Sequence, residues 1–336
     1  MGLGIASSEN VRVLDVHNAT RIQGALLISG TETRYNGPVI HILDLHDRAP
    51  RVIASFVLET KEGPVLFETG PESRFSVLLD GLNALGYAAP DVKHVFVTHI
   101  HLDHAGAAWR MAERGATIYV HPKGAPHLVD PSRLWASASR IYGDQMETLW
   151  GQMGHVPEGQ IEVVQDGQVI QIGEVRIQAL ETPGHAYHHH AYLIGDVLMG
   201  GDVTGVKTGR GPVLPPCPPP EIHIELWRES LARLRQLNLR QIYLTHFGLV
   251  EDVGPHLDAL EVRLLEWADW IKQKLKSGLT REQMVLEFEA HVAATLRAAG
   301  LSQEEVQEYE LADPSWMSVD GLVRYWNKHH PEEVVS

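Results

Sequence analysis

One short segment of the chain, residues 98–104, runs Thr-His-Ile-His-Leu-Asp-His and carries three imidazoles and a carboxylate. It follows an apolar stretch and precedes small residues, which is typical of a junction between a strand and a helix. Side chains two residues apart in an extended chain point the same way, so His99 and His101 can converge on one metal ion. Asp103 and His104, where the chain turns into a helix, can face a second ion. We therefore predict a metal site at the end of a strand.

Three later segments also place a potential metal ligand beside glycine at the expected end of a strand. They are residues 182–185 (Thr-Pro-Gly-His), 200–202 (Gly-Gly-Asp) and 244–248 (Leu-Thr-His-Phe-Gly). A lone histidine cluster can be a solvated polar loop, but that explanation weakens when potential ligands recur in similar settings. Imidazole nitrogen and carboxylate oxygen are donors that zinc accepts in proteins. His185, Asp202 and His246 thus join the candidate ligands.

Taken in this order, the four segments resemble the motifs of the metallo-β-lactamase superfamily of hydrolases. The turn at residues 66–70 resembles the first motif of that family, with Glu68 where the family usually has aspartate. The role of position 68 therefore stays open at this point. The resemblance covers roughly residues 50–250, and its motifs are specific for the fold but only weakly specific for the substrate. It implies an α/β fold, a four-layer αββα sandwich, to which the chain adds a C-terminal helical extension.

The resemblance also implies two divalent metal ions held by seven side chains. One ion would take His99, His101 and His185, the other Asp103, His104 and His246, with Asp202 bridging the two. Zinc is the expected metal, with iron and manganese as alternatives, because imidazole and carboxylate ligands suit all three. Asp103 and Asp202 are the candidate catalytic residues, and Asp103 can double as a proton shuttle to the leaving group.

The full ligand set favours a dinuclear metallo-hydrolase, similar to glyoxalase II and to acyl-homoserine lactonases. In such an enzyme a hydroxide that bridges the two metals attacks the carbonyl of a small ester, thioester or lactone. Three alternatives stay open: a mononuclear iron oxygenase similar to persulfide dioxygenases, a phosphodiesterase of the same superfamily, and a noncatalytic protein stabilised by metal. Metal analysis of the purified protein would separate the first of these from the hydrolase.

A segment rich in aromatic residues, about 123–156, separates the second motif from the third. Its middle part, 131–150, is helical in character, and we expect it to cap the metal site as an insertion. Its rings belong either to the core or to an apolar wall for the substrate. The candidate pocket residues are Trp135, Tyr142, Tyr187, His188 and His189. Cys217, in a proline-rich loop, is a further candidate for the pocket edge, although no partner base for a nucleophilic thiol can be named.

The last third of the chain is helical in pattern. Leucines 257, 260 and 264 are spaced by three or four residues, which is typical of a helix stripe that faces a core. No flexible linker precedes this part. We therefore expect residues 1–254 to form the catalytic domain and residues 255–336 to form a helical extension packed on the same domain.

Composition limits the partners of the chain. A formal net charge of −15 and a pI near 5.7 argue against binding to nucleic acid or to an anionic membrane surface, because both need a basic patch. We expect a small-molecule substrate, and a homodimer through the helical extension is compatible with the sequence. The single cysteine excludes an internal disulfide, and the first residues lack a basic and apolar leader, so a cytoplasmic location is expected.

Overall fold

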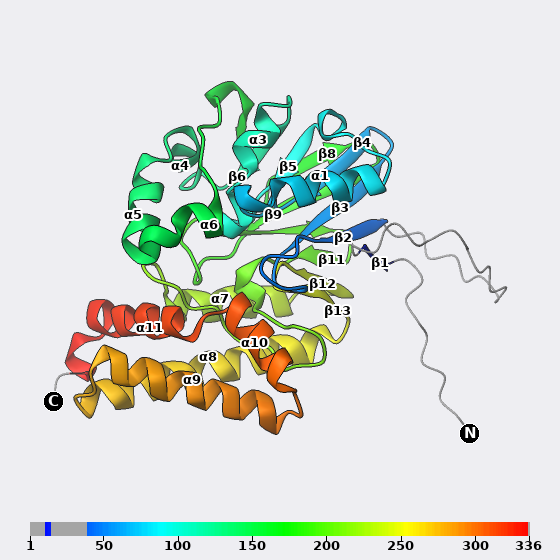
Figure 1. Ribbon diagram of the computed structural model, residues 1–336. Coiled ribbons are helices and arrows are strands. Elements are labelled where there is room, and N and C mark those ends of the chain that lie inside the picture. Colours follow the sequence, from blue (N-terminus) through cyan, green and yellow to red (C-terminus); the bar gives the residue numbers. More distant parts are fainter. Residues whose placement is uncertain (1–10, 15–38, 335–336) are drawn as a thin grey trace, which may run out of the picture.

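Two β-sheets lie face to face at the centre of the protein, and helices cover both (Figure 1). The computed structural model describes residues 11–14 and 39–334. Residues 25–28 (Ala-Leu-Leu-Ile), whose short apolar run predicts a strand, lie outside the described part. Helices α1 to α6 gather on one side of the sheets, and the C-terminal helices lie together on the other side.

The first sheet has seven strands that neighbour one another in chain order. They are β1 (Val11–Leu14), β2 (Ile40–Asp44), β3 (Ala54–Thr60), β4 (Gly63–Phe67), β5 (His94–Phe96), β6 (Thr117–Val120) and β7 (Ile161–Val163). Strands β2, β3 and β4 pair antiparallel, whereas β4 to β7 run parallel. Parallel neighbours need a crossover, and α1 (Phe75–Ala84) supplies the one from β4 to β5.

The second sheet has six strands in the order β13-β12-β11-β10-β9-β8. They are β8 (Val169–Ile172), β9 (Val175–Glu181), β10 (His190–Ile194), β11 (Val197–Met199), β12 (Gln241–Leu244) and β13 (Gly248–Val250). Only β11 and β12 pair parallel, and α7 (Ile224–Arg235) lies between them in the chain. The tight turn from β10 to β11 uses Gly195 in the left-handed region, with φ 63°.

The side chains of strand β10 alternate between two separate cores. Tyr192 and Ile194 pack in the cluster between the sheets, whereas Ala191 and Leu193 pack against the helices on the outer face. A third cluster joins the first sheet to α1 and α3 (Ala108–Ala112). Three apolar interfaces separate four layers, which confirms the predicted αββα sandwich.

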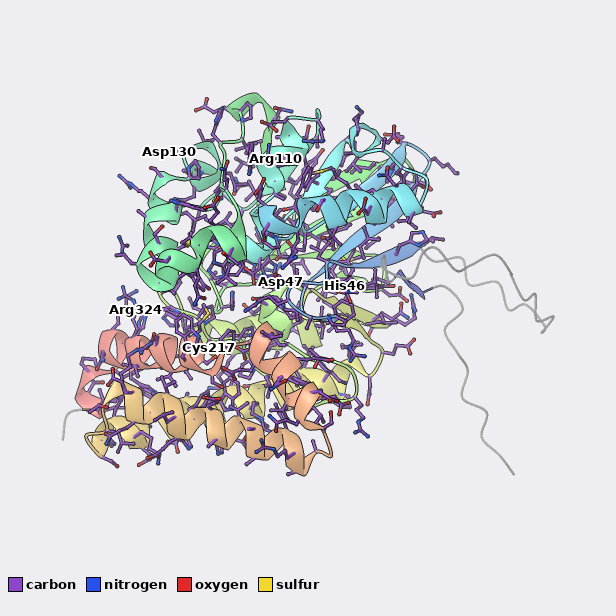
Figure 2. All side chains as sticks on the ribbon, viewed as in Figure 1. His46, Asp47, Arg110, Asp130, Cys217 and Arg324 are labelled. Carbon is purple, nitrogen blue, oxygen red and sulfur yellow. The ribbon has the colours of Figure 1, made fainter. Side chains whose placement is uncertain are left out.

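The cap expected at residues 123–156 consists of three short helices, α4 (Ala125–Val129), α5 (Ser132–Tyr142) and α6 (Met146–Trp150). The single helical stretch suggested by the sequence is broken at Gly143, whose φ of 53° ends α5. Glu72 anchors the end of the cap, because one carboxylate oxygen pairs with Arg110 at 2.6 Å and the other accepts from the backbone of Gln152 at 3.0 Å. Figure 2 labels Arg110 on the same face of the molecule as the cap.

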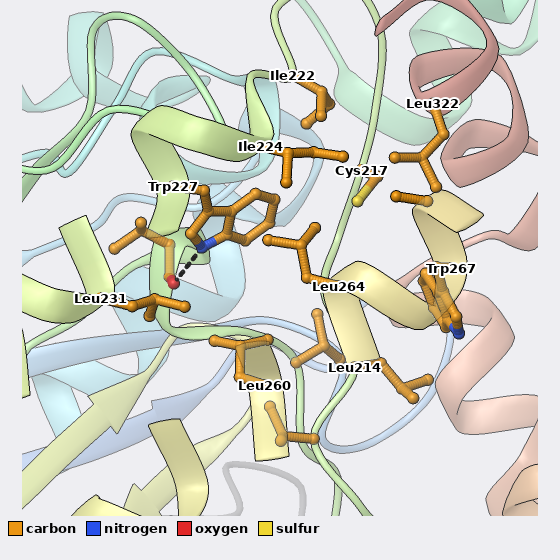
Figure 3. Close-up of a cluster of buried hydrophobic side chains, with 14 of the residues drawn as sticks. Leu214, Cys217, Ile222, Ile224, Trp227, Leu231, Leu260, Leu264, Trp267 and Leu322 are labelled. Carbon is orange, nitrogen blue, oxygen red and sulfur yellow. Dashed lines mark hydrogen bonds between the residues drawn. The ribbon is translucent and has the colours of Figure 1, made fainter. Parts of the chain in front are cut away.

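The C-terminal helices share one core with the outer face of the second sheet. They are α8 (Val253–Lys276), α9 (Arg281–Ala298), α10 (Gln303–Ala312) and α11 (Ser315–His329). Figure 3 shows Trp227 of α7, Leu264 of α8 and Leu322 of α11 around this core. The indole of Trp227 donates a hydrogen bond to the Val203 carbonyl at 2.7 Å. The boundary between residues 254 and 255 stays a prediction. Among the described helices, none is both long and apolar enough to cross a membrane.

Replacement of Leu264 tests this shared core. Leu264 is fully buried, so Leu264→Ala should leave a cavity and lower the free energy of unfolding by about 2–5 kcal/mol. Val262, on the same helix, is 56% exposed, and Val262→Ala should change it by less than about 0.5 kcal/mol. Chemical denaturation measures both. The helical tail (residues 255–336) could instead unfold in a separate transition. If Leu264→Ala shifts the midpoint of that transition and leaves the unfolding of the catalytic part unchanged, the two parts do not share one core.

Candidate metal centre

The seven predicted ligands come together at one edge of the sandwich. His99 and His101 follow β5, and Asp103 and His104 lie on the short helix α2 (Leu102–Ala105). The second sheet supplies the others, each from a loop that follows a strand: His185, Asp202 and His246. Three groups of these residues have ligand atoms within 4.8 Å of one another. Both sheets therefore end at a common cluster of imidazoles and carboxylates.

The first group is a triangle of histidines. Nε2 of His99 lies 2.9 Å from Nδ1 of His101, and Nε2 of His185 lies 3.1 Å from the same atom. His99 and His185 are buried, and His101 is partly exposed. Burial lowers the pKa of His101 to about 3, with help from His185. Burial also holds the pKa of His99 well below its ordinary value. The ring nitrogens of His99, His101 and His185 are therefore close enough together to be ligands of one metal ion.

Asp202 lies between this triangle and the second group, which consists of Asp103, His104 and His246. Its Oδ2 is 3.3 Å from Nε2 of His185, and its Oδ1 is 3.2 Å from Nε2 of His104. In the second group, Asp103 Oδ2 lies 3.3 Å from Nε2 of His246. One carboxylate thus contacts both groups, as a ligand shared by two ions would.

Neighbouring charges shift the pKa values of His104 and Asp202. Burial opposes the charged form of His104, but the carboxylates of Asp202 and Asp103 raise its pKa well above the ordinary value. Burial likewise opposes ionisation of Asp202, yet the imidazoles of His104 and His185 hold its pKa well below the usual range. The carboxylate is therefore ionised and available as a ligand.

The polar atoms of the cluster fit divalent cations. Both ring nitrogens of His104 and Oδ1 of Asp202 are buried and form no well-aligned hydrogen bond among the described residues, although carboxylate oxygens of Asp202 and Glu68 lie within 3.3 Å of the His104 ring. Buried polar atoms normally have a partner, so such a concentration of unsatisfied donors and acceptors needs an explanation. Imidazole nitrogens and carboxylate oxygens are the ligands of zinc and of related divalent metals.

Hydrogen bonds behind the ligands fix their ring orientations. His185 donates from Nδ1 to the Pro216 carbonyl at 2.9 Å, and His246 donates from Nδ1 to the Val52 carbonyl at 2.6 Å. The proton on Nδ1 leaves the Nε2 lone pair of each ring facing the cluster. Sequence reasoning missed these carbonyl partners, because they come from loops without a motif.

Glu68 belongs to the same supporting layer. Its Oε1 accepts from the Thr98 hydroxyl at 2.5 Å and lies 3.3 Å from Nδ1 of His104. The Thr98 oxygen in turn lies 3.0 Å from Nδ1 of His99. Glu68 is buried, and its φ of 61° lies in the left-handed region. The question left open at position 68 thus has a structural answer, since the glutamate contacts one ligand directly and a second through Thr98.

A cavity of about 310 Å³ opens onto the cluster. Its floor includes His101, Asp103, Asp202 and His246. The cap, the proline-rich loop, the loop at 48–53 and the turn between α10 and α11 supply its walls. Most wall residues are apolar, so the cavity suits the hydrocarbon part of a small substrate.

The five predicted pocket residues divide into two groups. Tyr142 and His188 line the cavity. Trp135 does not line the cavity, and its ring packs within the cap against the cluster that contains Trp150. Tyr187 also lies off the cavity, with Lys123 and Lys328 over its ring. His189 lies behind the ligands, where its Nδ1 is 2.9 Å from the Thr182 hydroxyl.

Cys217 does not edge the pocket, contrary to the expectation. Its side chain is fully buried in the core shared with the tail (Figure 3). Burial raises the pKa of the thiol well above its ordinary value, which keeps it protonated. Pro216 and Pro218, on either side of it, line the cavity instead. Alternation of an extended chain explains the difference, because adjacent side chains point to opposite sides.

Several lining residues were missed by sequence reasoning. They are Arg48, Asp313 and Trp316 among others. Trp150 belongs to the aromatic segment whose rings were expected in the core or in the wall, and it lines the cavity. Arg48 resembles an ordinary solvated loop residue, and the tail residues lie far beyond the last motif.

A family model described as the metallo-beta-lactamase superfamily matches residues 48–246, more than half of the 336-residue chain. The chain is 28% identical over 161 residues to a metallo-beta-lactamase fold-containing protein, ST1585, of Sulfurisphaera tokodaii, covering 47% of this chain and 61% of that protein. It is 22% identical over 235 residues to an atrochrysone carboxyl ACP thioesterase of Aspergillus fumigatus, covering 68% of this chain and 45% of that protein. The chain thus spans about half the length of these two relatives.

Two further similarities concern a lactonase and a solved structure. An N-acyl homoserine lactonase of a Bacillus species is 26% identical over 222 residues, covering 57% of this chain and 79% of that protein. The crystal structure of a metallo-beta-lactamase family protein from Thermus thermophilus superposes with a TM-score of 0.66 at 20% identity, covering 86% of this chain and 93% of the other. This second likeness supports the fold, including part of the tail.

Metal content tests the role of the cluster. His104→Ala should lower the divalent metal bound per chain after saturation and desalting, because His104 belongs to two of the three ligand groups. His190→Ala is the matched control, since His190 is equally buried and its ring nitrogens also lack partners, but it joins none of these groups. Elemental analysis gives the result. Equal metal in both variants would contradict the assignment.

Proposed function

Because the chain belongs to the metallo-beta-lactamase superfamily, we propose that it is a dinuclear metallo-hydrolase of a small ester, thioester or lactone. One observation carries the proposal: seven ligand side chains in overlapping groups form and support the floor of a largely apolar cavity. The thioesterase and lactonase among its relatives act on bonds of this kind by name. Zinc is the metal that we propose, because its preferred ligands are imidazole and carboxylate groups.

His99, His101 and His185 would hold one ion, and Asp103, His104 and His246 the other, with Asp202 shared. When bound, such ions lower the pKa of water and polarise a carbonyl. Hydrolysis joins the oxygen of that water to the acyl carbon and breaks the bond from this carbon to the leaving oxygen or sulfur.

Asp103 is the residue placed to move the proton. It lines the cavity and contacts His246, so it can take a proton released from water and return it to the leaving group. Burial opposes the charged form of Asp103, but His104 and His246 hold its pKa well below the usual range. It is therefore ionised before the reaction begins.

The cap and the tail would hold the acyl part and exclude water. Ile141 and Trp150 of the cap face the cavity together with Leu311 and Met317 of the tail. An apolar enclosure strengthens the interactions between charges on the floor, because water no longer screens them. The substrate that fits best has a hydrocarbon part beside the bond to be cleaved.

Metal analysis combined with a substrate panel tests the hydrolase proposal. Protein stripped with chelator should lose turnover of thioesters, lactones and aryl esters, and two equivalents of zinc per chain should restore it. Protein heated and cooled without chelator is a control for damage. Binding of one iron, with oxygen consumed on a persulfide, would contradict the hydrolase, and so would full activity in chelator.

Two tryptophans of the cap test its contact with the acyl chain. Trp150 lines the cavity. Trp150→Ala should therefore lower the ratio of kcat/KM for an octanoyl ester to kcat/KM for an acetyl ester by about tenfold. Trp135 lies in the same segment but off the cavity, and Trp135→Ala should affect both esters equally. Steady-state kinetics on the two esters measures the ratio. The acyl contact is wrong if Trp150→Ala also reduces both esters by the same factor.

A further inference from the structure

We propose that the substrate carries a carboxylate that binds Arg48, an inference that rests on the proposed hydrolase function. Arg48 lies in the loop between β2 and β3 and lines the cavity. A guanidinium is planar and always charged, and it binds a carboxylate through two parallel hydrogen bonds. The substrate class would then be an acid-bearing ester or thioester.

The charges around Asp47 leave one cation in excess. Its two carboxylate oxygens are divided between Arg48, at 3.1 Å, and Arg74, at 3.2 Å. Among the described residues, neither arginine forms an ion pair with any other carboxylate. One negative charge therefore faces two positive charges, and only Arg48 of the pair lines the cavity. Figure 2 shows Asp47 near the middle of the molecule.

The loop holds Arg48 in a fixed position. Nη2 of Arg48 donates to the Leu311 carbonyl of the tail at 2.8 Å. The Asp44 carboxylate accepts from the backbone of His46 and of Arg51, both at 2.9 Å. Arg48 itself has a φ of 62°, a left-handed conformation that is costly for a residue with a long side chain. Backbone strain of this kind clusters at ligand-binding sites, where it positions a side chain in advance.

The other carboxyl groups on the walls do not neutralise Arg48. Glu221 lies 3.4 Å from Nε2 of His188 and accepts from the backbone of Tyr187 at 3.1 Å. Asp313 accepts from the Ser318 hydroxyl at 3.2 Å, and burial together with Glu310 raises the pKa of its carboxyl well above the ordinary range. Nε of Arg48 donates to Asp47 and Nη2 donates to the Leu311 carbonyl, so a carboxylate on the substrate would bind at Nη1, which has no partner among the described residues.

The test compares two thioesters of propanethiol that differ only in charge, the monoglutaryl and the pentanoyl compounds. The metal-loaded wild-type protein should favour the glutaryl thioester in kcat/KM by roughly tenfold to a hundredfold. Arg48→Gln should remove this preference, and Arg48→Lys should keep part of it. Arg74→Gln is the matched control, because it also removes one partner of Asp47 but lies off the cavity, and it should keep the preference. A second pair, pentanoyl thioesters of 3-mercaptopropionate and propanethiol, places the carboxylate on the leaving group.

The outcomes separate the inference from the hydrolase proposal. Cleavage of all three thioesters without preference in the wild type overturns the inference and leaves the hydrolase intact. A preference in either pair that survives Arg48→Gln overturns it as well. If no thioester, lactone or aryl ester is cleaved, the hydrolase proposal fails, and calorimetry with glutarate and pentanoate then decides. Equal affinities for the two acids overturn the inference, and tighter glutarate binding that depends on Arg48 supports it.

Discussion

The close approach of buried imidazoles and carboxylates at one edge of two sheets is the constraint on which this structure depends. Taking such groups out of water is costly unless each finds a partner, and several of their atoms find none among the described residues. The surrounding loops concentrate this cost at the edge where both sheets end. Cations shared by Asp202 and its neighbours would offset it, because they would satisfy the lone pairs that the protein leaves unpaired.

The rings are held by partners outside the cluster, so the geometry does not rely on a bound ion alone. Carbonyls of Val52 and Pro216 fix two ligands, and Glu68 acts on His104 and, through Thr98, on His99. A preset arrangement reduces the entropy that metal binding must overcome. Glutamate at position 68 reaches His104 from a backbone in the left-handed region.

The ligands could be predicted because four of them share one short segment after a strand, and the other three each follow a strand in a segment that contains glycine. The four layers followed from the same motifs. The cavity walls could not be predicted in this way, because they depend on contacts between distant segments. Trp135 and Trp150 lie in one aromatic stretch, and the break at Gly143 decides which of them faces inward. Cys217 shows the same limit, since a proline-rich loop gives no periodicity from which to infer the direction of a side chain.

The position of the tail in the sequence has a consequence for biosynthesis. Residues 311–317 complete one wall, and Leu311 holds Arg48 through its carbonyl. A ribosome makes the chain from the N-terminus, so all seven metal ligands emerge before this wall does. The wall therefore cannot close over the floor of the cavity until the last two helices have been made and have packed against the rest of the chain.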